Sequence, residues 1–192
     1  VVIRSAFERP AENETYSDRR FILWVGSFRS VKRPEMFVEL ARRLPQFKFV
    51  MIGGSASNQS AFYDDICRVA NELTNLELTG SVMYGDIGRY FGEAFLFVNT
   101  SSSEGFPNTY LQSWCRGTPV LATFDPDGVI DKFGLGQHCP GIDELEMAVL
   151  RFMSDEDLRK SAARRGVEYV NEHHRPDVVA AEYDSLFVSL CK

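Results

Sequence analysis

The sequence contains no apolar run close to the roughly 20 residues that a membrane-spanning helix requires. Residues 1–19 contain no long apolar stretch of the kind that marks a secretory signal peptide. Basic charge is also scarce, because 21 Lys and Arg residues face 27 Asp and Glu residues and the formal net charge is −6. This balance argues against nucleic acid or an anionic membrane surface as the main partner. The absence of an initial methionine raises the expectation that the chain was cut from a longer protein.

Cysteines with metal-binding or redox spacing are missing as well. None of the four cysteines forms a Cys-x-x-Cys pair or shares zinc-ligand spacing with a histidine. They are Cys67, Cys115, Cys139 and Cys191. We interpret them as reduced thiols with packing roles in a cytoplasmic protein. His173 and His174 are adjacent and cannot share one helix face, so they predict no metal site and are interpreted as groups at a helix C-terminus.

Short apolar runs alternate with helical periods from Arg20 onward. Residues 1–19 are interpreted as a linker or the remnant of a preceding domain, and residues 20–192 as one domain. The predicted strands span residues 21–26, 47–54, 76–80, 95–99 and 119–122. The predicted helices span residues 33–44, 60–73, 85–94, 107–116, 143–153, 155–173 and 177–190. Strands that are apolar throughout, with helices between them, predict a parallel sheet covered on both faces. The expected fold is therefore an α/β, Rossmann-like doubly wound sheet.

Two further expectations concern the C-terminal part of the chain. Past Gly128 the strand signal fades, so no strand is predicted there. The last helix is expected to bury one apolar stripe. Its members are Val178, Val179, Tyr183, Leu186, Phe187 and Leu190.

Small, polar and charged residues follow each predicted strand. They are Gly26, Ser27, Arg29 and Lys32; Gly53, Gly54 and Ser55; Gly80 and Ser81; Ser101 to Gly105; and Thr123, Asp125, Asp127 and Gly128. In a doubly wound sheet, ligands bind just beyond the carboxyl ends of the strands. Glycines allow a ligand to approach the backbone, serines supply hydrogen bonds, and the two basic residues supply positive charge. The set suits a polyanion that carries sugar-like hydroxyl groups.

Each of these residues also has a purely structural interpretation. The glycines suit turns, the basic residues suit a solvated loop, and Glu104 suits the start of a helix. The sequence has no G-x-G-x-x-G after the first strand and no GxxxxGK[ST], so neither a standard dinucleotide fingerprint nor a P-loop is present. The segment DPDG at residues 125–128 begins like a calcium loop but lacks the later ligands, and no metal site is predicted.

One stretch carries a family resemblance. SSSEGFPNTYLQSWCRGTPVLAT, residues 101–123, resembles the signature of glycosyltransferase family 4 (group 1), approximately S-x-x-E-G-F-P-x-x-x-x-E-x-x-x-x-G-x-P-V. WVGSFRSVKRPEMFVELARRLPQFKFVMIGG is similar to that family's first strand, basic loop, helix and second strand. LTGSVMYGDIGRYFGEAFLFVNTS is similar to the segment that follows. The resemblance extends from about Arg20 to the last helix.

The resemblance implies the C-terminal, donor-binding half of a GT-B glycosyltransferase. The expected ligand is a nucleotide-diphosphate sugar, which serves as donor substrate, and no further cofactor is expected. The expected partner is an N-terminal, acceptor-binding domain of the same polypeptide, through which peripheral membrane association is also conceivable. Family members retain the anomeric configuration and commonly act in cell-surface glycan synthesis. The isolated chain is expected to bind the donor but to transfer little.

The same resemblance assigns the site residues. Lys32 matches the phosphate-binding lysine, and Glu104 matches a glutamate that holds hydroxyls of the donor sugar. Ser27 stands where the family usually has an arginine, so we infer that Arg29 serves instead. Gln112 replaces a second glutamate that contacts the ribose, and its amide still accepts a hydrogen bond but lacks the charge. The catalytic candidates are Glu104, Lys32 and Arg29; the binding candidates are Gly26, Ser27, Gly53, Gly80, Ser81, Gly105, Phe106, Pro107, Asn108 and Gln112.

Other functions stay open from the sequence. Ser27 and Gln112 are compatible with a nucleotide-sugar-binding module that has lost transfer activity. A GT-B epimerase or hydrolase and an interaction domain without nucleotide are further alternatives. The nucleotide base is also open, because uridine, guanosine and adenosine donors are all used on this scaffold.

Overall fold

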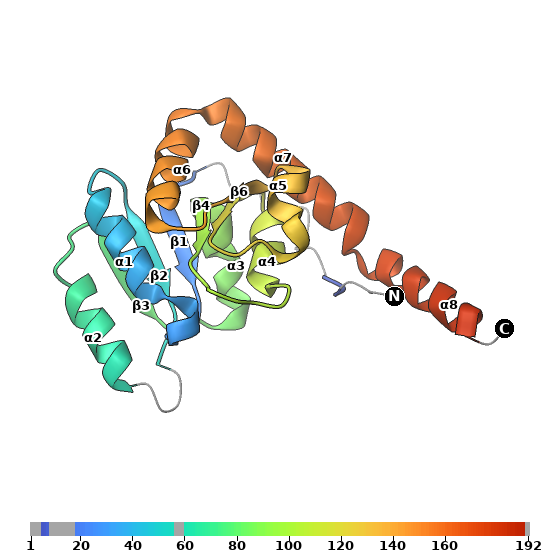
Figure 1. Ribbon diagram of the computed structural model, residues 1–192, viewed down its shortest axis with the longest axis horizontal. Helices are drawn as coiled ribbons and strands as arrows, with labels where there is room; N and C mark the ends of the chain where they lie inside the picture. The colour runs from blue at the N-terminus through green and yellow to red at the C-terminus, as the bar shows by residue number, and fades with distance from the viewer. Residues whose placement is uncertain (1–4, 8–17, 56–59, 191–192) are drawn as a thin grey trace.

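The computed structural model describes residues 5–7, 18–55 and 60–190, and its sheet confirms the predicted α/β fold (Figure 1). Within these residues six parallel strands have the order β3-β2-β1-β4-β5-β6. The strands are β1 (Phe21–Val25), β2 (Phe49–Ile52), β3 (Leu76–Gly80), β4 (Ala94–Asn99), β5 (Val120–Ala122) and β6 (Gly136–His138). The strand order reverses between β1 and β4. Such a reversal places a crevice at the carboxyl ends of the strands, where ligands of doubly wound sheets bind.

Helices cover both faces of the sheet, as strands without polar alternation require. The α-helices are α1 (Pro34–Arg43), α2 (Ser60–Ala70), α3 (Tyr84–Glu93), α4 (Asn108–Trp114), α5 (Val129–Phe133), α6 (Ile142–Ser154), α7 (Glu156–His173) and α8 (Pro176–Leu190). Ile22 and Trp24 of β1 pack with α1, α2 and α6. Phe21 and Leu23 point to the other face and pack with α3, α4, α5 and α7. The central strand therefore divides the core into two layers.

The prediction that no strand follows Gly128 is wrong. β6 pairs with β5 in parallel register and adds a sixth strand at the edge of the sheet. It has only three residues, which are half-buried, and it begins with Gly136 at φ 154°. The short helix α5 before it was also not predicted. A three-residue strand at an edge needs no apolar run, so the periodicity of the sequence gives no sign of it.

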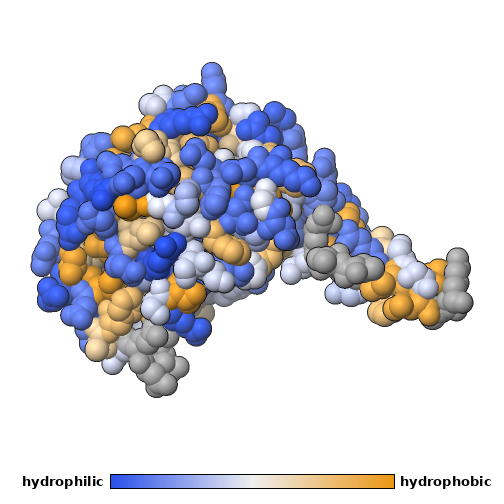
Figure 2. Space-filling model, in the orientation of Figure 1, coloured by the Kyte–Doolittle hydropathy of each residue, from blue (hydrophilic) through white to orange (hydrophobic). Residues whose placement is uncertain are grey.

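The predicted burial of the last helix is also wrong, although the helix itself is present. Within the stripe only Val179 is fully buried, whereas Tyr183, Phe187 and Leu190 are 45%, 59% and 72% exposed. The helix α8 leads away from the sheet beyond α7, and apolar side chains cover its far end (Figure 1 and Figure 2). The stripe is present in the sequence, but no described element lies against most of it.

Arg19 belongs structurally to the domain, although its sequence position predicted a place in the linker. Its guanidinium donates hydrogen bonds to the Thr118 hydroxyl at 2.6 Å and to the Gly117 carbonyl at 2.7 Å. It also donates to the carbonyls of Ala94 and Arg116. Burial, with a contribution from Arg159, lowers the pKa of Arg19 to about 10. Arg19 thus ties the chain before β1 to β4 and to the loop before β5.

No disulfide joins the cysteines within the described residues. Cys115 and Cys139 are buried and Cys67 is half-buried, in keeping with the packing roles predicted for them. Burial raises the pKa of the Cys139 thiol to about 12, so this group stays protonated and unreactive at neutral pH. Cys191 lies outside the described residues.

Candidate functional site

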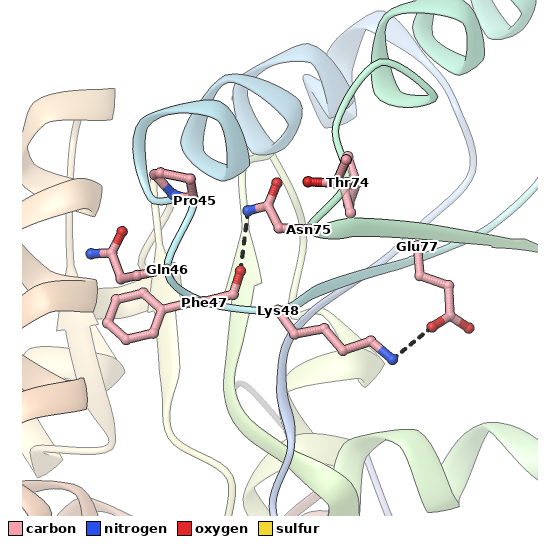
Figure 3. A pocket seen from close by; sticks show the side chains of 8 residues that line it. Pro45, Gln46, Phe47, Lys48, Thr74, Asn75 and Glu77 are labelled. Carbon is pink, nitrogen blue, oxygen red and sulfur yellow. Dashed lines mark hydrogen bonds and ion pairs between the residues drawn. The ribbon is translucent and has the colours of Figure 1, made fainter.

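A first pocket, of about 460 Å³, lies at the amino ends of β2 and β3 (Figure 3). Its polar side chains serve the fold. The amide nitrogen of Asn75 donates to the carbonyls of Ala41, Leu44 and Phe47, which end α1 and lead into β2. Lys48 and Glu77 form an ion pair at 2.9 Å across the neighbouring strands. This pocket lies at the amino ends of the strands, whereas ligands of doubly wound sheets bind at the carboxyl ends. It is therefore not the candidate functional site.

A second pocket, of about 410 Å³, opens at the carboxyl ends of β1, β2 and β3. Its lining comprises Val25, Gly26, Ser27, Ile52, Gly53, Gly54, Ser55, Ser81, Val82 and Ile87. Four of the predicted binding residues, Gly26, Ser27, Gly53 and Ser81, are therefore brought together here. Gly80, a fifth predicted binding residue, immediately precedes Ser81 in the chain.

Gly53 is required by the backbone around it, whereas Gly54 lies against a side chain. A Cβ atom on Gly53 would lie 1.8 Å from the Gly26 carbonyl oxygen, and Gly53 has φ 152°. A Cβ atom on Gly54 would lie 2.5 Å from the Ser81 hydroxyl. The turns after β1, β2 and β3 are thus pressed against one another. Sequence reasoning explained Gly53 by ligand approach, whereas its neighbour in the structure is the backbone of Gly26.

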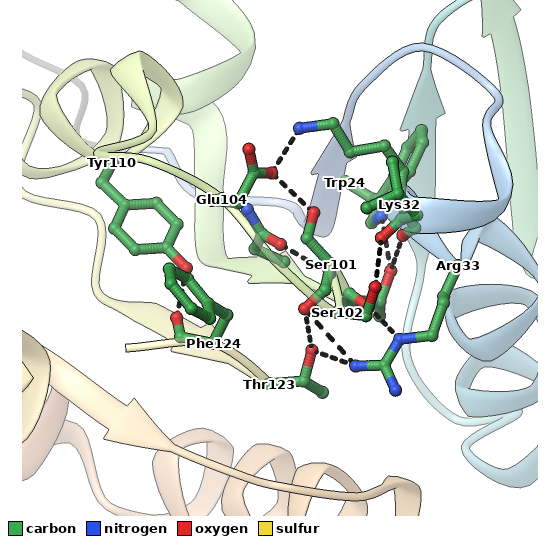
Figure 4. A network of polar contacts seen from close by, with 12 residues as sticks. Trp24, Lys32, Arg33, Ser101, Ser102, Glu104, Tyr110, Thr123 and Phe124 are labelled. Carbon is green, nitrogen blue, oxygen red and sulfur yellow. Dashed lines mark hydrogen bonds and ion pairs between the residues drawn. The ribbon is translucent and has the colours of Figure 1, made fainter. Parts of the chain in front are cut away.

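Two predicted catalytic residues, Lys32 and Glu104, meet between the loops that follow β1 and β4 (Figure 4). The 3₁₀ turn Ser30–Lys32 follows β1, and the Lys32 ammonium forms an ion pair with a carboxylate oxygen of Glu104. The same oxygen accepts a hydrogen bond from the Ser101 hydroxyl at 2.6 Å. The side chains of Lys32 and Glu104 are 27% and 14% exposed, so both remain accessible from the crevice. Folding brings together two opposite charges that are 72 residues apart in the sequence.

The backbone around Lys32 and Glu104 is fixed by buried hydrogen bonds. The fully buried Thr100 donates its hydroxyl to the Lys32 carbonyl at 2.7 Å and accepts from the Trp24 indole at 3.0 Å. The backbone N–H of Ser102 donates to the Val31 carbonyl at 2.9 Å. These bonds join the loop after β1 to the loop after β4.

Arg33 is a part of this arrangement that sequence reasoning missed. Its guanidinium donates to the Thr100 carbonyl and to the Thr123 hydroxyl, each at 2.6 Å. The Thr123 hydroxyl in turn donates to the Ser101 carbonyl at 2.8 Å. Arg33 also has φ 45°, a left-handed conformation that costs a non-glycine residue on the order of 1–3 kcal/mol. An arginine beside Lys32 resembles any other loop charge in the sequence, and only the folded loops reveal its partners.

Arg29, the third catalytic candidate, lies apart from this pair. It is exposed on the loop between β1 and the 3₁₀ turn. Among the described residues, no ion pair joins it to Glu104. The structure therefore brings Lys32 and Glu104 together and leaves Arg29 exposed on the neighbouring loop.

The segment from Gly105 to Gln112 leads from Glu104 into α4. Gly105 and Asn108 are exposed and Pro107 is buried. The Phe106 ring packs against Trp114 and the buried ring of His174, at centroid distances of 6.3 and 5.2 Å. Only the backbone of Phe106 is thus suited to face a ligand. His173 is the last residue of α7 and His174 is its C-cap, which confirms their predicted place at a helix C-terminus, and the His174 ring is also buried. Gln112 is 8% exposed on α4.

A buried tyrosine joins the helix after Glu104 to the loop that follows β5. The Tyr110 hydroxyl donates to the Phe124 carbonyl at 2.7 Å. Burial, together with the negative charges of Glu104 and Asp125, raises the pKa of Tyr110 above its usual range. Tyr110 therefore stays protonated and links α4 to the loop after β5.

Comparison with known proteins identifies the family. The family model described as glycosyl transferases group 1 matches residues 6–168. The chain belongs to this family. A lipopolysaccharide core biosynthesis glycosyltransferase, LpsE of Rhizobium meliloti, is 25% identical over 190 residues, which cover 93% of this chain and 53% of that protein. The chain thus spans about half the length of this glycosyltransferase relative.

Solved structures share the fold. TarM of S. aureus, in a complex that includes UDP, matches 97% of this chain and 39% of its own with a TM-score of 0.78 and 16% identity. The C-terminal domain of the group 1 glycosyltransferase LpcC from Francisella tularensis matches 88% of this chain and 96% of its own, with a TM-score of 0.69 and 17% identity. The second match shows that a domain of this size and fold has been crystallised by itself.

Membrane-spanning helices and metal-binding clusters are both absent from the part of the chain that the structure describes, residues 5–7, 18–55 and 60–190. Over these ranges no helix combines the length and the apolar character needed to pass through a bilayer. Within the same ranges no three His, Cys, Asp or Glu side chains gather in a way that could hold a metal ion.

Proposed function

We propose that this chain is the donor-binding domain of a retaining glycosyltransferase that moves a sugar from a nucleotide-diphosphate sugar to an acceptor. The observation that carries the proposal is the convergence of Lys32 and Glu104 in the loops after β1 and β4, at the end of the sheet where the pocket after β1, β2 and β3 also opens. A cation and a carboxylate at one point suit a ligand that carries both phosphate and sugar hydroxyls. The UDP bound in the TarM structure, which has the same fold, supports this class of ligand.

The chemistry follows from the charges. Breaking the bond between sugar and phosphate builds negative charge on the leaving diphosphate, which the Lys32 ammonium stabilises. Glu104 accepts hydrogen bonds from hydroxyls of the donor sugar and so orients its reacting carbon. The nucleoside occupies the pocket between Gly26 and Val82, and Gln112 accepts a hydrogen bond from the ribose. Arg29 on the neighbouring loop adds positive charge near the diphosphate.

The acceptor lies outside this chain in our proposal. An N-terminal domain of the same polypeptide binds the acceptor and provides any peripheral membrane contact. This division agrees with a chain that spans about half of LpsE. The naming of LpsE for lipopolysaccharide core biosynthesis favours a role in cell-surface glycan synthesis in the cytoplasm. The chain alone then binds donor but transfers little.

Calorimetric titration with UDP, GDP and ADP tests the proposal. We expect at least one of the three to bind, and a Lys32→Ala variant to weaken that binding by about 10- to 100-fold. A hydrogen bond to a charged group contributes about 1.5–3 kcal/mol, and each 1.4 kcal/mol is a factor of ten. The matched control is Lys48→Ala, which removes an ammonium paired with Glu77 at the opposite edge of the sheet. Equal binding by the Lys32 and Lys48 variants would contradict the assignment.

A binding module without transfer activity is the second candidate, and Gln112 is the residue that favours it. In the full-length protein we expect Gln112→Glu to change the turnover number by less than about tenfold, since one charge on one hydrogen bond is worth about 1 kcal/mol. The readout is the rate of sugar transfer, with Gln46→Glu at the other edge of the sheet as control. If Gln112→Glu instead raises the turnover number from the detection limit by orders of magnitude, the natural protein is a binding module that lost its transfer activity through the change at position 112.

A further inference from the structure

We propose that Arg33 is a positioning residue that holds Lys32 and Glu104 at the separation the donor requires. The inference rests on the proposed donor-binding function. It concerns the brace, by which we mean Arg33, Thr100, Thr123 and the hydrogen bonds between them. The brace joins the loops that follow β1, β4 and β5.

The brace acts on both members of the pair. On the Lys32 side, Thr100 bonds the Lys32 carbonyl at 2.7 Å, and Arg33 is the next residue in the chain. On the Glu104 side, Thr123 bonds the Ser101 carbonyl at 2.8 Å, and the Ser101 hydroxyl bonds the Glu104 carboxylate at 2.6 Å. A displacement of the Arg33 guanidinium would therefore move both charged groups relative to each other.

The residue type points to a role for the side chain. Position 33 has φ 45° and precedes Pro34, a combination that glycine adopts far more easily than arginine. Arginine is nevertheless present, and two arms of its planar fork reach two different loops at 2.6 Å each. A lysine ammonium is a single point charge and cannot hold both acceptors in that geometry. Arginine thus occupies a position where its backbone is strained, and its side chain links three loops there. This combination indicates that the side chain has a role.

Direct contact with the ligand is the competing interpretation. Figure 4 shows the Arg33 guanidinium directed toward Thr123, whereas the Lys32 side chain extends toward Glu104. The Arg33 Nε and Nη2 atoms already donate to protein acceptors. Because these two nitrogens are held by the protein, we assign Arg33 an effect on the ligand through Lys32 and Glu104.

Four variants of the chain test the role of the brace. Arg33→Gly suits the backbone conformation and removes the guanidinium, and Arg33→Lys keeps the charge but not the fork. Thr123→Val removes the hydroxyl with little change of shape, and Thr123→Ser restores it. Each variant is titrated with UDP, GDP and ADP, and its thermal midpoint and the hydrogen exchange of the Ser102 amide are measured. That amide bonds the Val31 carbonyl and reports whether the two loops stay together without any ligand.

We expect Arg33→Gly and Arg33→Lys to weaken diphosphate binding at least tenfold, with a thermal midpoint within a few degrees of wild type. Thr123→Val weakens binding in the same direction, and Thr123→Ser stays close to wild type. Exchange of the Ser102 amide accelerates at least tenfold in Arg33→Gly and Thr123→Val. Because Arg33 acts through Lys32, Arg33→Gly added to Lys32→Ala weakens binding by less than twofold more.

Three results would overturn the positioning role. Unchanged exchange of the Ser102 amide in Arg33→Gly means that the guanidinium does not hold the loops together, whether or not a diphosphate binds. Wild-type affinity in Arg33→Gly refutes the inference and leaves the donor site intact. A loss in Arg33→Gly that Thr123→Val does not share, and that adds fully to the loss in Lys32→Ala, shows direct contact with the ligand. Failure of the wild-type chain to bind any diphosphate counts against the proposed function, while the exchange measurement still decides on the brace.

Discussion

A Gly53→Ala variant is expected to lose more than about 4 kcal/mol of stability, a loss that only a few mechanisms produce. The added methyl would lie 1.8 Å from the Gly26 carbonyl oxygen, so the turns after β1 and β2 would have to separate. The φ of 152° at Gly53 adds a conformational penalty for any residue with a side chain. Domains of ordinary size are stable by about 5–15 kcal/mol, so the loss would remove about a quarter or more of the domain's stability.

Gly80→Ala is the matched control for Gly53→Ala. Gly80 also has positive φ, at 70°, but nothing lies within 4 Å of its Cβ position. We expect a cost of only about 1–2 kcal/mol, which is the penalty of the left-handed conformation. Urea unfolding followed by the fluorescence of the buried Trp24 and Trp114 measures both variants. Equal midpoints for the two would show that the turns are not held in close contact in solution.

The sequence predicted the central part of the sheet because burial on both faces leaves a strong pattern. β1, β2, β4 and β5 are almost continuously apolar, and each was predicted within a few residues. β6 has the sequence GQH and lies half-buried at an edge, so no such pattern exists. The apolar stripe of α8 showed which residues share a face. It could not show whether another element lies against that face, and the structure leaves Phe187 59% exposed.

The candidate site was predictable to a similar extent. Lys32 and Glu104 follow two different strands of a parallel sheet, and such positions meet at one edge. The strand pattern was therefore enough to place both residues at the same end of the sheet, although it did not predict the ion pair between them. Arg33 was not predictable, since its left-handed backbone and its bonds to Thr100 and Thr123 exist only when three loops are in place. Gly53 was predicted as a binding residue, but the sequence could not show that the Gly26 backbone lies against it.

Replacing Glu104 removes the ion pair with Lys32, and the result separates phosphate binding by Lys32 from sugar binding by Glu104. A Glu104→Gln variant is expected to bind the free diphosphate at least as tightly as wild type, because its neutral amide neither pairs with Lys32 nor repels phosphate. The same variant is expected to lose affinity for the nucleotide sugar, since the amide oxygen that replaces the carboxylate accepts weaker bonds from the sugar hydroxyls. The charge on the acceptor is worth about 1 kcal/mol for each hydrogen bond, so with one or two such bonds sugar transfer by the full-length protein should fall by about 5- to 30-fold.

Titration of the variant with a nucleoside diphosphate and with the same nucleotide carrying glucose measures this difference, with Glu77→Gln as control. Glu77 is paired with Lys48 at the opposite edge of the sheet, so its loss should affect neither ligand. If Glu104→Gln binds the diphosphate at least as tightly as wild type but the nucleotide sugar more weakly, the sugar lies beside the Glu104 side chain. A parallel loss of both affinities would mean that Glu104 acts by holding the Lys32 ammonium in place. The donor sugar would then have to be oriented by other groups, such as the exposed Asn108 or the backbone of Gly105.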